Sequence, residues 1–236
     1  MPRETVATRR ARALRIVRLL ARSYPDAACA LHHHNAFELL VATILSAQCT
    51  DKKVNQVTPG LFGRFPTPQA MAAADPTELE RRIQPTGFFR QKTKSILSVS
   101  QDLVTRFHGE VPSTLEELVT LRGVGRKTAN VVLGNAFEIP GLTVDTHMLR
   151  INGRLGLTKQ SDPVKVERDL MQLVPQKEWT LYSHRVIQHG RVCCDARKPR
   201  CEACPLRGEC PWPASVHARR AAARRPAKRR AARARP

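Results

Sequence analysis

The sequence predicts an all-α protein, and three observations support that class. No segment shows the sustained alternation of apolar and polar residues that a half-buried β-strand needs. Polar residues suited to capping a helix recur along the chain, each followed by a proline or by a glutamate three positions later. The segments after these signals carry apolar residues at helical spacing and are joined by short links. With 236 residues and 42% hydrophobic content, the chain can bury a core as one large or two small domains.

The first predicted helix follows a basic N-terminus. Residues 1–11 are polar and basic, and we expect them to be flexible. The helix begins near residue 12, because the apolar residues that follow fall on one stripe. This segment lacks an uninterrupted apolar core and a cleavage site, so we do not interpret it as a targeting signal. The stripe consists of Ala13, Ile16, Val17 and Leu20.

The next two predicted helices include one that is fully buried. Asn35, with Glu38 three residues later, caps a helix over residues 36–48. That helix is apolar on nearly every side, which predicts that it lies in the core of a domain. A further helix is predicted over residues 51–61, with its valines turned inward.

Caps and stops define the helices that follow. Two short helices each begin with a capping residue before a proline at the first helical position. A long helix then spans residues 88–108 and ends at Gly109. The two cap-and-proline pairs are Thr67-Pro68 and Asp75-Pro76. Three later helices are also predicted: one with Asp145 in its first turn, one that begins at Ser161-Asp162-Pro163, and one over residues 178–191.

A tight hairpin is predicted between two helices near the middle of the chain. A capping box at Ser113 opens a helix that runs to Leu121, and a second helix spans residues 128–137. Gly123 and Gly125 in the link can take positive φ, which allows successive N–H groups to point outward at the start of the second helix. Such an arrangement suits an anion, and a DNA phosphate in particular.

The charge of the chain favours a polyanionic partner. Lys and Arg number 40 against 20 acidic residues, a formal net charge of +20. Nine of the basic residues lie in the segment 218–236, which contains only Ala, Arg, Lys and Pro, so the rest of the chain is basic as well. Charge alone does not separate nucleic acid from an anionic membrane surface. No run of 18 apolar residues exists, so we expect no membrane-spanning segment.

Four of the seven cysteines form a pattern typical of a metal site. Their spacing is C-x6-C-x2-C-x5-C near the C-terminus, which favours a metal site in a reducing compartment over a disulfide framework and predicts a cytoplasmic protein. Four thiolates suit an iron–sulfur cluster or a structural zinc, and the spacing leaves both open. Cys29 and Cys49 are interpreted as small buried or half-buried side chains rather than ligands. Three adjacent histidines at 32–34 point in different directions and are not expected to bind metal. The four cysteines are Cys194, Cys201, Cys204 and Cys210.

The hairpin and a second motif resemble one family. The segment LRGVGRKTAN over residues 121–130 and the segment VDTH over residues 144–147 are similar to the endonuclease III family of DNA glycosylases, and the resemblance extends from about residue 12 to about residue 212. It implies that Lys127 is the catalytic nucleophile and Asp145 the catalytic aspartate. It also implies that the four cysteines hold a [4Fe–4S] cluster, with Cys193 outside the ligand set.

The resemblance implies a two-lobed, all-α helix-hairpin-helix fold that extrudes a damaged base from duplex DNA. Side chains from three segments of the chain would fill the space that the extruded base leaves in the DNA duplex. The hairpin and the basic loop between the first two cysteines would contact phosphates. The implied DNA-contacting residues are Gln48, Phe88, Arg122, Gly123, Val124, Gly125, Arg126, His147, Arg197, Lys198 and Arg200. The expected organisation is a basic N-terminus at 1–11, a six-helix domain at 30–140 containing the helix-hairpin-helix at 113–137, a second helical domain from 12–29 and 141–213 with the iron–sulfur loop at 194–210, and a basic disordered tail at 214–236.

The implied activity is base excision repair. The chain would remove oxidised pyrimidines from double-stranded DNA, cleave the strand at the abasic site by β-elimination through a lysine Schiff base, and act as a DNA-associated monomer. Two residues depart from the family pattern. Arg122 stands where the family usually has proline and adds a charge for phosphate at the hairpin entrance, and Phe88-Phe89, which bears on substrate range, stands where the family commonly has an aliphatic residue beside tyrosine. One alternative is a monofunctional mismatch glycosylase, which lacks a lysine at the position of Lys127. The other is a non-catalytic iron–sulfur DNA-binding protein, against which the presence of both Lys127 and Asp145 counts.

Overall fold

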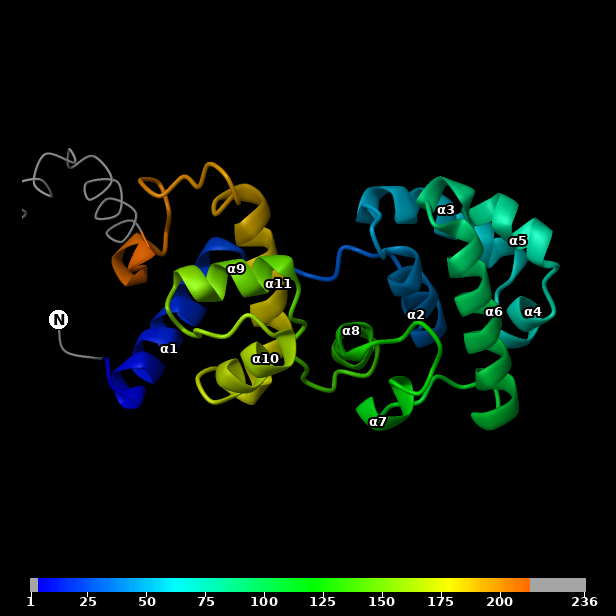
Figure 1. Ribbon diagram of the computed structural model, residues 1–236, viewed down its shortest axis with the longest axis horizontal. Helices are drawn as coiled ribbons and strands as arrows, with labels where there is room; N and C mark the ends of the chain where they lie inside the picture. The colour runs from blue at the N-terminus through cyan, green and yellow to red at the C-terminus, as the bar shows by residue number, and fades with distance from the viewer. Residues whose placement is uncertain (1–3, 213–236) are drawn as a thin grey trace, which may run out of the picture. The chain divides into compact units, whose positions relative to one another are not determined.

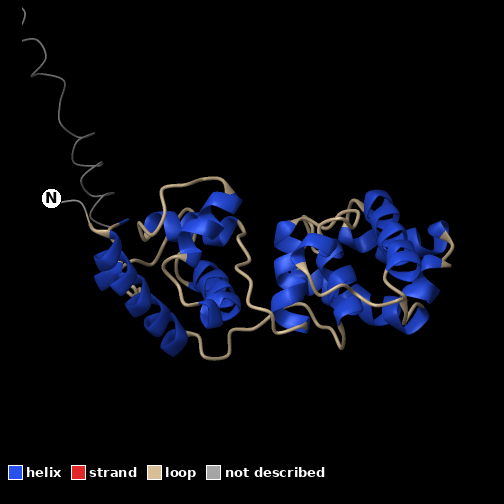
Figure 2. Cartoon of the chain, turned by 90° about the horizontal axis from the view of Figure 1, so that it is seen from below, coloured by secondary structure: helices blue, strands red, loops and turns tan. Residues whose placement is uncertain are grey.

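The computed structural model describes residues 4–212, and their regular structure is entirely helical (Figure 2). The predicted all-α class is therefore confirmed for this part of the chain. The α-helices are α1 (Val6–Ser23), α2 (Ala36–Leu45), α3 (Asp51–Arg64), α4 (Pro68–Ala72), α5 (Pro76–Ile83), α6 (Phe89–Arg106), α7 (Leu115–Leu118), α8 (Arg126–Ala136), α9 (Thr146–Arg154), α10 (Pro163–Met171) and α11 (Trp179–Val192). Short 3-10 helices are η1 (Gln84–Thr86), η2 (Gln176–Glu178) and η3 (Arg207–Glu209).

The chain divides into two compact units. We call residues 26–145 and 175–184 the hairpin unit, and the described parts of residues 1–25, 146–174 and 185–236 the cysteine unit. This division differs from the predicted one, because residues 26–29, 141–145 and 175–184 belong with the hairpin unit.

The hairpin unit is built around α2. Every residue from Phe37 to Leu45 is buried, as the apolar sequence of this helix predicts. Helices α3, α6 and α8 pack against α2, and α4 and α5 pack against α6 (Figure 1). The predicted caps are present, since the side chains of Asn35, Thr67 and Asp75 each accept a hydrogen bond from a first-turn N–H group. These contacts fix the helix starts that carry the connecting loops.

The cysteine unit is built on the apolar stripe of α1. The four residues predicted for that stripe are all buried. Arg12 extends from the same helix and donates hydrogen bonds to the carbonyl oxygens of Leu155 (2.6 Å) and Glu209 (3.0 Å). Arg15 pairs with the Glu209 carboxylate at 2.7 Å. Helix α1 is thereby attached to η3, the turn that immediately precedes Cys210.

Three local predictions need correction. Residues 6–11 are not a flexible terminus, because α1 begins at Val6 and the Thr5 side chain caps it. The helix predicted over 113–121 is a single turn, and Thr114 rather than Ser113 is its cap, accepting from the N–H of Glu117 at 3.3 Å. Both residues have a glutamate three positions later, so the sequence pattern alone does not separate them. The predicted tail at 214–236 and residues 1–3 lie outside the described residues.

The helix predicted over 36–48 ends earlier, at Leu45. Gln48 has a φ of 53°, which is incompatible with a continued right-handed helix. Among the described helices, none combines the length and the apolar composition required to cross a bilayer.

Candidate functional site

The hairpin between α7 and α8 depends on one glycine. Gly123 has a φ of +78°, and a Cβ added there would lie 2.9 Å from Ser95 Oγ on α6. Gly125 differs from the prediction, because its φ is −90° and it serves as the extended N-cap of α8. Val124 is 5% exposed, and its N–H donates to the Leu121 carbonyl oxygen at 3.1 Å. The side chain and the N–H of Val124 therefore anchor the hairpin, and its contact with DNA stays a prediction.

Substitution of Gly123 by Ala is expected to destabilise the protein by about 2 kcal/mol. A left-handed conformation costs a residue with a Cβ about 1–2 kcal/mol, and the approach of Ser95 adds a clash. Gly125→Ala is the matched control, because no atom lies within 4 Å of a Cβ at that position. Urea unfolding of both variants measures the difference. Equal losses of stability would contradict the assignment of the strain to Gly123.

Lys127 lies exposed in the first turn of α8. The first N–H groups of a helix have no acceptor within the helix and carry the positive end of its dipole, so this turn attracts anions. Arg122 is exposed in the hairpin, and Arg126 is half-buried at the first position of α8. Asp145 is half-buried and directly precedes α9, rather than lying in its first turn as predicted.

Gln48 and Phe88 share an unusual backbone conformation. Their φ angles are 53° and 48°, in the left-handed region that residues with a Cβ rarely adopt. Phe88 is also 64% exposed, although it is a large apolar residue. Strained residues persist only where the surrounding structure holds them, and they gather at functional sites. Sequence analysis did not predict this strain, because neither residue is a glycine or an asparagine.

His147 is oriented by a neighbouring arginine on α9. The Arg150 guanidinium donates to His147 Nδ1 at 3.1 Å and also to the carbonyl oxygen of Cys194 at 3.1 Å. Because arginine only donates, Nδ1 is an acceptor and the proton of the neutral ring is on Nε2. Gly190 of α11 permits this packing, since a Cβ there would lie 2.3 Å from His147 Nδ1. Arg150 was missed in the sequence because only the fold brings these groups together.

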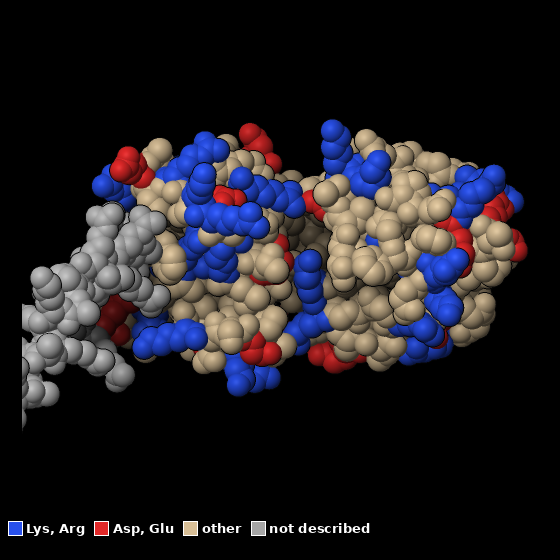
Figure 3. Space-filling model, turned by 45° about the horizontal axis from the view of Figure 1, so that its top comes forward, with Lys and Arg blue, Asp and Glu red and all other residues tan. Residues whose placement is uncertain are grey.

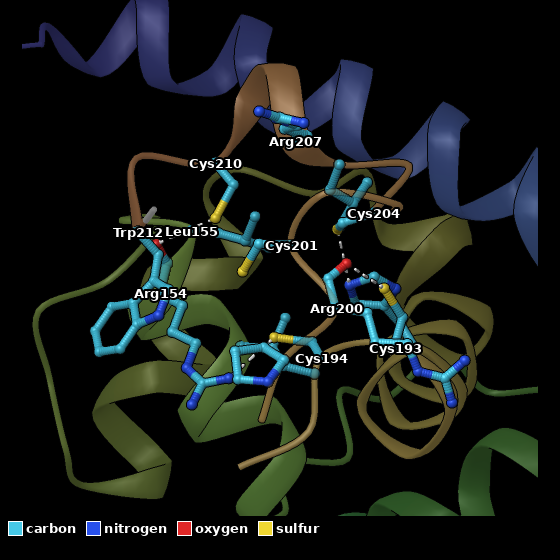
Figure 4. Close-up of a pocket in the computed structure, with 14 residues that line it drawn as sticks. Arg154, Leu155, Cys193, Cys194, Arg200, Cys201, Cys204, Arg207, Cys210 and Trp212 are labelled. Atoms are coloured by element: carbon cyan, nitrogen blue, oxygen red, sulfur yellow. Dashed lines mark hydrogen bonds between the residues drawn. The ribbon is translucent and has the colours of Figure 1, made fainter. Parts of the chain in front are cut away.

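The four predicted cysteines line one hollow in the cysteine unit (Figure 4). The hollow has an empty volume of about 390 Å³, and the sulfur of Cys193 lies beside that of Cys204. A [4Fe–4S] cluster requires four thiolates around one space, and this donor set meets that requirement. His189 also lines the hollow, with Nε2 at 3.7 Å from the Cys204 sulfur.

Two N–H donors face sulfur atoms of this hollow. Arg154 donates to the Cys194 sulfur at 3.2 Å and to the carbonyl oxygen of Asp195 at 2.7 Å. Burial lowers the pKa of His189 to about 4, so its ring is neutral, and burial raises the pKa of Tyr24 to about 12, so its hydroxyl keeps its proton. Tyr24 then donates to His189 Nδ1 at 2.8 Å, which leaves the ring proton on Nε2, facing the Cys204 sulfur. Such donors stabilise the negative charge of thiolate ligands.

Burial also affects the thiols themselves. It raises the pKa of Cys204 to about 12 and the pKa of Cys210 above its ordinary value. Without a metal these thiols are therefore protonated at neutral pH, and metal binding must release their protons.

The loop between the first two cysteines has an ordered start. The Asp195 carboxylate accepts hydrogen bonds from the N–H groups of Arg197 (2.8 Å) and Lys198 (2.9 Å). The N–H of Arg200 donates to the Cys193 carbonyl oxygen at 3.0 Å. Arg197, Lys198 and Arg200 are all exposed. Lys and Arg side chains also gather on the visible face of the cysteine unit (Figure 3).

Cys204→Ser is expected to lose the cluster, whereas Cys193→Ser is expected to retain it. Cys204 belongs to the ligand set that the resemblance implies and Cys193 does not, although both thiols line the hollow. Visible absorbance and iron content of the two purified variants measure the difference. Loss of iron in Cys193→Ser, with iron retained in Cys204→Ser, would mean that Cys193 is a ligand and Cys204 is not.

Two family models match the chain. Residues 41–176 match that of the HhH-GPD superfamily base excision DNA repair proteins. Residues 194–210, from the first to the last of the four cysteines, match the iron-sulfur binding domain of endonuclease III.

Proteins named Endonuclease III are similar over most of the chain. The relative from Synechocystis sp. is 53% identical over 207 residues, which are 87% of this chain and 94% of that protein. The relative from Bacillus subtilis is 46% identical over 188 residues, which are 79% of this chain and 86% of that protein.

Two solved structures agree closely with the fold. A non-covalent Endonuclease III–DNA complex has a TM-score of 0.84 at 41% identity and covers 89% of this chain and 98% of that chain. A trapped Endonuclease III–DNA covalent intermediate has a TM-score of 0.84 at 42% identity and covers 88% of this chain and 98% of that chain.

Proposed function

Because this chain belongs to the endonuclease III family, we propose that it is a base excision repair enzyme, a bifunctional DNA glycosylase and abasic-site lyase. Its partner is double-stranded DNA, and we assign it oxidised pyrimidines and abasic sites as substrates. We also assign it a monomeric state. The observation that carries the proposal is the exposed Lys127 in the first turn of α8, directly after the hairpin, in a chain that also presents Asp145 before α9.

In the proposed reaction, the neutral amine of Lys127 attacks C1′ of the damaged nucleotide. The C1′–N bond breaks and the base leaves with its electron pair, taking up a proton. The sugar ring then opens: the C1′–O4′ bond breaks, O4′ takes up a proton, and a Schiff base forms between Lys127 and C1′. Removal of a C2′ proton then expels the 3′ phosphate. Asp145 is assigned to accept a proton from the lysine or to stabilise the cationic sugar. A covalent intermediate trapped for a structure at 42% identity supports this route.

We assign the exposed side chains of Gln48 and Phe88, together with His147, to the space that the extruded nucleotide leaves. An extruded base costs the duplex a few kcal/mol of stacking and pairing, which inserted side chains offset. The strained backbones of Gln48 and Phe88, together with the exposure of Phe88, support this role. The larger Phe88 wedge is expected to affect which opposite bases are accepted.

The remaining DNA contacts are assigned to cations and to the hairpin backbone. Phosphate contacts position the duplex and make binding depend on salt. The residues assigned to this role are Arg122, Gly123, Gly125, Arg126, Arg197, Lys198 and Arg200.

The chain contains a [4Fe–4S] cluster, and we assign Cys194, Cys201, Cys204 and Cys210 as its ligands. When bound, the cluster supplies iron–thiolate bonds at four points of the loop. Arg154 and His189 place N–H donors against two of the ligand sulfurs. The exposed cations between the first two ligands are thereby held as a fixed array for phosphates.

Borohydride trapping of the wild-type protein tests the proposal. The substrate is a duplex with one oxidised thymine, and a covalent protein–DNA adduct together with a nicked strand is the expected result. Base release without an adduct would indicate a monofunctional glycosylase. Binding without base release would indicate a non-catalytic DNA-binding protein.

A further inference from the structure

The two loops that carry Gln48 and Phe88 have their bases close together. Gln48 lies three residues after Leu45, the last residue of α2. Phe88 lies two residues after Thr86, the last residue of η1, and the intervening Gly87 has a φ of 71°. Because Gln48 and Phe88 carry a Cβ, their left-handed backbone conformations are strained, and contacts with other residues must hold them.

Lys92 supplies a contact to both loops. Its Nζ donates to the Leu45 carbonyl oxygen and to the Thr86 carbonyl oxygen, both at 2.8 Å. The two acceptors are 47 and 6 residues away in sequence, so a single ammonium group joins segments from different parts of the chain. Leu45 ends α2, and a cation there also meets the negative end of the helix dipole.

The burial of Lys92 indicates that its ammonium group has a specific structural role. The residue is 4% exposed, in the second turn of α6, which begins at Phe89. Burial lowers the pKa of Lys92, which records the unfavourable environment of the ammonium. An apolar side chain would fill this space without that cost. The ammonium is retained where it contacts the bases of the two strained loops.

We propose that Lys92 is a positioning residue that holds the Gln48 and Phe88 loops at the spacing required for both side chains to enter the duplex. The proposal rests on the gap-filling role assigned to these two residues. Because Lys92 is buried, we assign it no contact with DNA or with the reacting sugar. Its loss therefore affects steps that need a filled gap and spares the covalent chemistry of Lys127.

The principal variant is Lys92→Met, which removes the donors and keeps most of the side-chain length. Lys94→Met is the matched control, because Lys94 lies exposed on the same helix. Melting temperature and cluster absorbance identify variants that fold. Where Lys92→Met does not fold, Lys92→Arg, which keeps a cation and its donors but changes their geometry, takes its place.

Two single-turnover rates separate gap filling from the covalent chemistry of Lys127. The first is base excision from a duplex with an oxidised thymine, which requires gap filling. The second is borohydride trapping on single-stranded DNA with a preformed abasic site, which has no opposite base. Because a misplacement of 1 Å can cost about 100-fold in rate, we expect Lys92→Met to slow excision by about 10- to 100-fold, with little change in trapping. Equal slowing of both rates would overturn the proposal.

A double-mutant cycle distinguishes loss of loop positioning from general destabilisation of the protein. In a Gln48→Ala, Phe88→Ala background the loops have no side chains left to position, so Lys92→Met is expected to slow excision by less than about threefold. The same factor in both backgrounds would overturn the role of Lys92 while leaving the proposed function intact. If the wild type neither excises nor traps, the proposed function fails, and the assignment of Lys92 fails with it.

Discussion

Lys127→Ala is expected to abolish covalent trapping on a duplex with an oxidised thymine. The Schiff base requires a primary amine at C1′, and alanine offers none. Strand cleavage by β-elimination is lost for the same reason. Because Lys127 is exposed in the first turn of α8, its removal leaves the core unchanged, and folding and DNA affinity are expected to persist. Trapping gels, a melting curve and a binding titration measure the three properties.

Lys159→Ala is the matched control, since Lys159 is exposed in the cysteine unit and has no assigned role. It removes the same charge and is expected to trap as the wild type does. A covalent adduct that persists in Lys127→Ala would place the nucleophile elsewhere. Loss of folding in that variant would mean that Lys127 has a structural role.

Local patterns predicted the elements whose stability is local. Asn35 with Glu38 marked the start of α2, and the side chain of Asn35 accepts from the N–H of Glu38 at 2.9 Å. The apolar stripe of α1 predicted four buried residues, and all four are buried. Spacing of the four cysteines predicted that they would share one site, and they line one hollow. In each case the signal lies within one short stretch of the sequence.

Boundaries and supporting contacts were less accessible to sequence analysis. Ser113 and Thr114 offer equivalent capping patterns, and the choice between them depends on how the turn packs. Lys92 and Arg154 look like surface cations in the sequence, because their acceptors are 47 and 40 residues away. The left-handed Phe88 has no local signature, since its conformation is imposed by the structure around it. Such residues are identified only after distant segments are brought together.

Asp145→Asn is expected to slow base excision by about 100- to 10,000-fold, the range typical of a lost general acid or base. Asparagine keeps the shape of the side chain but cannot accept the lysine proton or carry the charge that stabilises a cationic sugar. A preformed abasic site has no base to expel. Trapping at such a site is therefore expected to slow much less than excision, and the ratio of the two single-turnover rates measures what the carboxylate contributes to base departure.

The matched control for this charge change is Asp26→Asn, because Asp26 is exposed in the connector after α1. It is expected to leave both rates unchanged. If Asp145→Asn slows both reactions equally while its melting temperature matches that of the wild type, the carboxylate serves the shared attack of Lys127 at C1′ rather than departure of the base. If neither rate changes, Asp145 is not a catalytic residue, and another group must stabilise the sugar as the bond to the base breaks.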